Sequence, residues 1–340
     1  MDNNSSKEII FKGLKKIYNY FFYFLIIIFF FMIFYLSDNS PREEKIDLGI
    51  YSMNYDVNTL PESRTGKEIK YGYKIFEETY KILGKDSLEF SIVGNSLSCT
   101  NCHLNGGTQP FAMPLIGVDK RFPQYRGRED VIGSLEDRIN GCFERSMNGS
   151  RLKNDSNEMI AIVSYINWLG RYVKSNEVIA GKGLKQIDYP NRKVDLAKGE
   201  IVFNRVCVEC HAADGQGQKS DQFTYLYPPL WGPNSYNNGA GMTRVLTAAT
   251  FIKYNMPQGV TFDSPTLTDE ESYDVAGYIN QQLRPQKNNL KEDFPDLKKK
   301  PMSTPYPPYT DSFSQLQHQL GPFQPIFDFY KTEYNIIKSK

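Results

Sequence analysis

Two short stretches decide how this chain folds: Cys99-Thr100-Asn101-Cys102-His103 and Cys207-Val208-Glu209-Cys210-His211. Both have the pattern C-x-x-C-H, and the same series of features surrounds each of them. Self-similarity at one long spacing is the mark of a duplicated structural unit. We therefore interpret the chain as a tandem repeat of a unit of about 110 residues.

Helical segments flank each copy of the motif. No convincing alternation of apolar and polar residues appears, so we expect both halves to be helical. A capping box, Thr268-x-x-Glu271, opens the last helix of the second half, and Asp155-x-x-Glu158 stands at the equivalent place in the first. In the first half the order is helix 67–83, the motif, Pro114-Leu115-Ile116-Gly117 and helix 159–169; in the second it is helix 195–206, the motif, Pro229-Leu230-Trp231-Gly232 and helix 273–283.

The pattern C-x-x-C-H is typical of covalent haem c attachment. Its two thiols form thioethers to the haem vinyl groups and the adjacent imidazole ligates iron. A zinc site built from two C-x-x-C pairs is the first alternative, but such pairs normally lie 15–20 residues apart. A thioredoxin-like dithiol is the second alternative, and it needs a βαβ context that is absent. We predict two haem c groups, one bound by Cys99, Cys102 and His103, the other by Cys207, Cys210 and His211.

The second axial ligands must come mostly from residues other than histidine. The chain has three histidines, and the one outside the motifs, His318, lies far away in the tail. In the second half Met256, followed by Pro257, stands where a distal ligand is expected, with Met242 as the fallback. Met opposite His raises the reduction potential of a haem and suits electron transfer. Met256 as simple core filler is the alternative.

The first half differs at the corresponding place, where Cys142 is the fifth and unmatched cysteine. We predict that its thiolate ligates the first haem iron, because a leftover thiol in an exported protein needs an explanation. Alternatively, Cys142 is a small buried apolar side chain and Met147 is the ligand. On a helix over 134–148, opened by Ser134-x-x-Asp137, one face would carry Arg138, Cys142, Arg145 and Ser146, although Asn140-Gly141 weakens that helix.

Positive charge gathers around Cys142. Between residues 120 and 153 there are eight basic residues against five acidic ones. Arginine guanidinium groups suit bidentate binding of oxyanions, so a small anion is the expected substrate. A solvated surface of mixed charge is the alternative.

The N-terminal region carries an apolar run. Residues 17–36 hold no charge and as a helix would be about 30 Å long, enough to cross a bilayer. Lysines precede the run and acidic residues follow it, which places the amino terminus in the cytoplasm and exports the rest. A cleaved signal peptide is the alternative. We expect an uncleaved anchor in the inner (cytoplasmic) membrane, with the catalytic domains in the periplasm.

Composition fits this organisation and excludes other classes. Lys+Arg and Asp+Glu number 40 and 39, so overall basicity does not indicate a nucleic-acid binder. Five cysteines in 340 residues are too few for a disulfide scaffold. The fold class is mainly α, with an irregular C-terminal tail. The expected parts are an anchor (1–37), a spacer (38–66), cytochrome c domain 1 (67–175), a linker (176–195), cytochrome c domain 2 (196–285) and a packing tail (286–340).

Two segments closely resemble the dihaem cytochrome c thiosulfate dehydrogenases: residues 95–104 (NSLSCTNCHL) and residues 137–149 (DRINGCFERSMNG). The similarity covers roughly residues 60–330. It implies an enzyme that couples two thiosulfates into tetrathionate with release of two electrons, with some members also running in reverse. It also implies that Cys142 is the distal cysteine and that Arg128, Arg138 and Ser146 line the substrate pocket.

The same resemblance implies an electron route and leaves two other functions open. Electrons would pass from the Cys142 haem to the Met256 haem and on to a cytochrome c partner. Some members have Lys just before that Met, whereas Asn255 stands here, so we expect no redox-linked exchange of ligands. The main alternative is a membrane-anchored dihaem cytochrome that only transfers electrons, which Met147 as a ligand would favour. A dihaem peroxidase is the third reading, although such enzymes usually need additional histidines.

Overall fold

The computed structural model describes residues 3–38, 46–84, 91–175, 177–220 and 225–339. It separates into two units, residues 1–46 and 47–340. In the first unit, α1 (Asn3–Asp38) contains one segment, Ile9–Ile33, long and apolar enough to cross a membrane, with a mean hydropathy of 1.9. This helix has the length and composition of a membrane span or of a signal sequence. Positions 39–45 of the predicted spacer lie outside the described residues.

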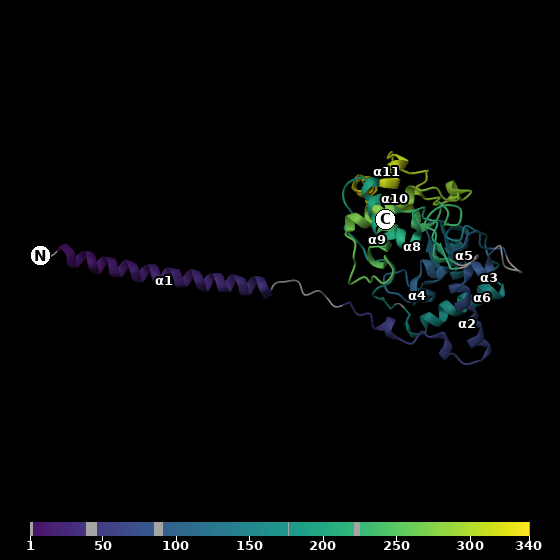
Figure 1. Ribbon diagram of the computed structural model, residues 1–340, viewed down its shortest axis with the longest axis horizontal. Helices are drawn as coiled ribbons and strands as arrows, with labels where there is room; N and C mark the ends of the chain where they lie inside the picture. The colour runs from purple at the N-terminus through teal and green to yellow at the C-terminus, as the bar shows by residue number, and fades with distance from the viewer. Residues whose placement is uncertain (1–2, 39–45, 85–90, 176, 221–224, 340) are drawn as a thin grey trace. The chain divides into compact units, whose positions relative to one another are not determined.

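The second unit is a helical body with two short hairpins (Figure 1). Its helices are α2 (Arg64–Glu77), α3 (Thr79–Leu83), α4 (Leu104–Gly107), α5 (Leu135–Arg145), α6 (Asn157–Leu169), α7 (Leu196–Val202), α8 (Val208–His211), α9 (Val245–Asn255), α10 (Asp269–Gln281), α11 (Gln315–Leu320) and α12 (Gln324–Tyr334). The hairpins are antiparallel pairs, β1 (Gln124–Arg126) with β2 (Val131–Gly133) and β3 (Gln218–Lys219) with β4 (Tyr225–Tyr227).

Each half has its own apolar core, and the same kind of helix pair occurs in both. In the first half α2 packs against α6, and in the second α7 packs against α10. A glycine stands at each crossing and lets the backbones come together. A Cβ on Gly72 would lie 2.0 Å from the carbonyl oxygen of Ala161, and one on Gly199 would lie 2.3 Å from that of Asp274. The two halves therefore repeat the same packing in three dimensions.

This close approach gives a prediction for stability. Gly72→Ala should lower the free energy of unfolding by about 1–3 kcal/mol, because the added methyl group forces the two helices apart. Gly199→Ala should act alike in the second half. The measurement is a guanidinium chloride titration followed by circular dichroism. Lys74→Ala, an exposed change on the same helix α2, is the control and should stay within about 0.5 kcal/mol of the original chain. A neutral Gly72→Ala would contradict the tight crossing.

The structure confirms the fold class and corrects several details. The first predicted helix is interrupted, because α2 ends at Glu77 and α3 begins at Thr79. The cap of α6 is Ser156, whose hydroxyl accepts from Met159 N, and not Asp155. The two hairpins were not expected. Part of the predicted spacer is folded, since Val57 lies in the first core. The tail over residues 286–340 is not wholly irregular, because it contains α11 and α12.

Candidate functional site

A cavity of about 360 Å³ lies between the first C-x-x-C-H motif and α5. Cys102 and His103 line it on one side, and Cys142 lines it from α5. The predicted helix face is confirmed, since Arg138, Cys142, Arg145 and Ser146 all border this cavity together with Arg128. Met147 is only 4% exposed and belongs to the apolar core, so it does not line the cavity. The structure thus brings together Cys142, and not Met147, with His103.

The helix that carries Cys142 is fixed at its start and across its weak middle. Ser134 and Asp137 form the predicted capping box at the first turn of α5. Asn140 does not break the helix, because its side chain is fully buried and pairs with the backbone of Leu152, accepting from N at 2.8 Å and donating to O at 3.0 Å. Polar residues therefore hold α5 in register where glycine would loosen it.

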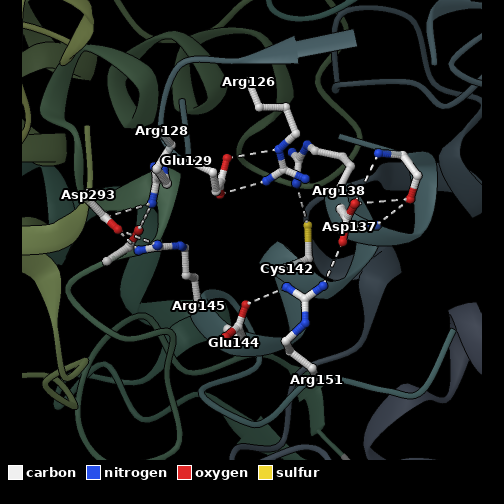
Figure 2. Close-up of polar contacts among 12 residues, drawn as sticks. Arg126, Arg128, Glu129, Asp137, Arg138, Cys142, Glu144, Arg145, Arg151 and Asp293 are labelled. Carbon is white, nitrogen blue, oxygen red and sulfur yellow. Dashed lines mark hydrogen bonds and ion pairs between the residues drawn. The ribbon is translucent and has the colours of Figure 1, made fainter. Parts of the chain in front are cut away.

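Cys142 is in a strongly polar environment. Arg138 Nη1 donates to Cys142 Sγ at 2.9 Å, as Figure 2 shows. Burial alone would raise the pKa of the thiol, but the Arg138 charge and the His103 ring outweigh it and lower the pKa to about 6. A thiol of this kind is a thiolate at neutral pH, and thiolates are both metal ligands and nucleophiles.

The two motif histidines are oriented in the same way. His103 Nδ1 lies 2.6 Å from Met113 O, and His211 Nδ1 lies 2.8 Å from Pro228 O. Each carbonyl immediately precedes the Pro-Leu pair of its half. A hydrogen bond at Nδ1 fixes the tautomer and leaves Nε2 as a basic nitrogen for a metal. This shared arrangement fits two iron-ligating imidazoles, one in each half.

The remaining candidate ligands fall in different places. Met256 follows the end of α9 and packs against the core of the second half, whereas Met242 packs against both cores and lines the Cys142 cavity. His318 is held on both ring nitrogens, by Met302 O at 2.6 Å and Asp311 Oδ1 at 2.9 Å, so its role is structural. Among the described residues, no cluster of three or more His, Cys, Asp or Glu side chains is arranged to hold a metal ion.

Two arginines of the cavity are anchored by the C-terminal tail. Arg145 makes a bidentate ion pair with Asp293, at 2.6 and 2.8 Å, and Arg128 Nη1 lies 3.5 Å from the same carboxylate (Figure 2). Tyr306, also in the tail, donates its hydroxyl to Asp293 at 2.6 Å. Burial, followed by the charge of Arg145, lowers the pKa of Arg128. The tail therefore positions the positive side of the cavity.

The second half also contributes to the site. Arg128 Nη1 donates to Gly239 O at 2.8 Å, and Asn237 donates to Glu144 O, next to the end of α5, at 2.9 Å. Gly241, Met242, Arg244 and Thr247 line the cavity from this side. Sequence reasoning missed Asp293 and Arg244. Nothing in the local sequence marks them, since Asp293 is 148 positions from the arginine it binds.

Comparisons with known proteins identify the class of both halves. Residues 91–174 match the model of the SoxA/TsdA cytochrome c domain, and residues 196–283 match the cytochrome c model. Two cytochrome c domains in one chain, each with a C-x-x-C-H motif, define a c-type cytochrome that binds haem c.

Within that class, the chain belongs to the thiosulfate dehydrogenase family, and it is an oxidoreductase. The thiosulfate dehydrogenase of Allochromatium vinosum is 40% identical over 66% of this chain and 82% of that protein. The enzyme of Psychrobacter arcticus is 38% identical over 71% of each chain. Among solved structures, thiosulfate dehydrogenase (TsdBA) from Marichromatium purpuratum superposes with a TM-score of 0.63 at 35% identity, covering 68% of this chain. This chain spans about half (49%) of that longer protein.

Proposed function

We propose that this protein oxidises two thiosulfates to tetrathionate at the Cys142 cavity. The observation that carries the proposal is the meeting of a thiolate-type cysteine, a motif histidine and several arginines in one cavity. The first half, 67–175, would hold the catalytic haem, and the second, 196–285, the electron-transfer haem. In this scheme the haems supply one chemistry, the acceptance and onward transfer of electrons.

Specific residues in each half would hold the two haems. Cys99, Cys102, His103 and Cys142 would hold the first haem, the latter two as iron ligands. Cys207, Cys210, His211 and Met256 would hold the second, with His211 and Met256 as iron ligands. A thiolate donates electron density to iron while a thioether raises the potential. Electrons would therefore run from the first half to the second.

Cys142 also explains how a sulfur–sulfur bond forms in two easier steps. Its thiolate and the terminal sulfur of one thiosulfate would join with the loss of two electrons, leaving the sulfur chain attached to Cys142. The terminal sulfur of a second thiosulfate then attacks the sulfur that is bonded to Cys142. The bond to Cys142 breaks, which releases tetrathionate and regenerates the thiolate. Atoms and charge balance in both steps, and no proton is consumed. The reverse sequence, given two electrons, would cleave tetrathionate.

The arginines lower the main electrostatic obstacle, the approach of two dianions. Arg138 contacts Cys142 directly, so it would hold the sulfonate of the thiosulfate that reacts first. Arg128 and Ser146 line the same cavity and would orient the substrate further. Fixed positive groups of this kind stabilise the charge at the reacting sulfur without reorganising.

We also propose the surroundings in which the enzyme works. The apolar segment Ile9–Ile33 would anchor the chain in the inner membrane, with the cytochrome domains on the periplasmic side, where haem c is attached. A soluble cytochrome c would take the electrons from the second haem. The nearly equal numbers of basic and acidic residues, 40 and 39, give no indication of a nucleic-acid partner.

The ligands of the first haem distinguish this enzyme from a cytochrome that only transfers electrons. In the full-length protein, low-temperature electron paramagnetic resonance should show one low-spin haem of the thiolate type, and Cys142→Met should convert that signal to a His/Met type. Met147→Leu is the matched control and should leave the spectrum unchanged. A thiolate signal that survives in Cys142→Met would reject Cys142 as the ligand, and the absence of that signal from the original protein would favour the electron-transfer reading.

A further inference from the structure

Five arginines line the Cys142 cavity, and four of them have an anionic or sulfur partner. Arg126 makes two hydrogen bonds to Glu129, at 2.9 and 3.0 Å, while Arg128 and Arg145 share Asp293. Arg138 donates to Cys142. The fifth is Arg244. Within the described parts of the chain, no carboxylate pairs with it.

Arg244 comes from the other half of the molecule and sits immediately before α9. Among the described residues, its side chain makes one hydrogen bond, from Nε to Gly241 O at 3.2 Å, within its own turn. The two terminal nitrogens of the guanidinium group are thus left for another partner. Thr247, three residues further along the chain, lines the same cavity.

Two other arginines act on the charge of Arg244, and Tyr306 acts in the opposite direction. Burial, followed by the charges of Arg128 and Arg138, lowers the pKa of its guanidinium to about 10. At neutral pH the group is still a cation. A partly buried cation beside two others, with no carboxylate to offset it, is costly unless an anion binds.

We propose that Arg244, supplied by the second cytochrome c half, binds an oxyanion in the Cys142 cavity of the first half. Two oxyanions have the required chemistry, the sulfonate of thiosulfate or tetrathionate and the carboxylate of a haem. The sulfonate source rests on the proposed function. It gives Arg244 a clear task, since tetrathionate has a sulfonate at each end and Arg138 beside Cys142 can hold only one of them. The substrate site would then span both halves.

The experiment uses the full-length holoprotein in detergent, with Arg244→Gln, Arg244→Lys and the control Arg205→Gln. Arg205 is 54% exposed and pairs with Glu271 on the surface of the same half. Oxidised protein is titrated with tetrathionate by calorimetry in a Cys142→Ser background, because the Cys142 thiolate would otherwise displace thiosulfate from tetrathionate without any reductant. Haem content, the midpoint potential of each haem and the thermal midpoint are measured on the same samples.

With a sulfonate at Arg244, tetrathionate binding should weaken about 10- to 100-fold in Arg244→Gln, with partial recovery in Arg244→Lys and unchanged potentials. With a haem carboxylate there, binding should persist while haem content or the potential of one haem falls. Both results support an oxyanion at Arg244 and identify its source. The inference is overturned if Arg244→Gln matches Arg205→Gln in affinity, haem content and potentials.

These outcomes also separate the inference from the proposed function. Loss of tetrathionate affinity in Arg244→Gln, in a protein that does not oxidise thiosulfate, would retain the oxyanion site and reject the activity. Full activity in the original protein, with no effect of Arg244→Gln on any measurement, would retain the activity and reject the site.

Discussion

Replacing Cys142 by glycine is expected to lower the rate of thiosulfate oxidation by at least about 10³-fold while both haems stay attached. The substitution removes the sulfur that would carry the first thiosulfate and leaves Arg138 without its 2.9 Å partner. Steady-state assays with an artificial electron acceptor, with tetrathionate measured as the product, give the rate. The haem content of the same samples is measured as the pyridine haemochrome.

Two further variants serve as comparisons for that result. Met147 lies in the apolar core, five residues from Cys142, and does not line the cavity. Met147→Leu replaces it by an apolar side chain of similar volume and should keep activity within about threefold. Cys142→Ser should be nearly as inactive as Cys142→Gly, since a hydroxyl group is a poor substitute for a thiolate in sulfur transfer. Substantial turnover by Cys142→Gly would remove the covalent role, whatever the haem content.

Asp293→Asn should destabilise the protein by about 3–5 kcal/mol. Asp293 is 7% exposed, accepts hydrogen bonds from Arg145 and Tyr306 and forms an ion pair with Arg128, so the loss of its charge leaves two cations without compensation. Because Arg128 and Arg145 border the cavity, the KM for thiosulfate should also rise. The measurements are the denaturant midpoint and the steady-state kinetics of the full-length protein.

Asp296→Asn is the matched control. Asp296 lies three residues away in the same tail, is 40% exposed and pairs with Lys299 at 3.6 Å. Exposed pairs of this type contribute about 0–1 kcal/mol, so both stability and KM should stay close to those of the original chain. Equal effects of the two substitutions would show that the tail does not position the arginines of the cavity.

Local patterns were sufficient to predict much of the fold. The repeat, the helical class and the face shared by Arg138, Cys142, Arg145 and Ser146 follow from spacing, because residues three or four apart on a helix are neighbours. The capping boxes at Ser134 and Thr268 could also be predicted, because each joins residues only three positions apart. The hairpins were not, since each strand has only two or three residues and no room for a period.

What the sequence did not reveal depends on contacts between distant segments. Asn140 looked like a helix breaker, yet its amide is satisfied by Leu152, and only the fold places that backbone beside it. Asp293 looked like one more charge in a proline-rich tail. The close packing at Gly72 and Gly199 could not be predicted, because it depends on which helix lies against each glycine.

The most direct test of the central claim is the stoichiometry of the reaction catalysed by the full-length protein with both haems attached. Thiosulfate and a one-electron acceptor are supplied, and the reduced acceptor and tetrathionate are both quantified. The account predicts one tetrathionate for every two acceptors reduced. Haems that stay oxidised with thiosulfate, and no tetrathionate formed or cleaved with an acceptor or a reductant present, would contradict it and leave a cytochrome that only transfers electrons.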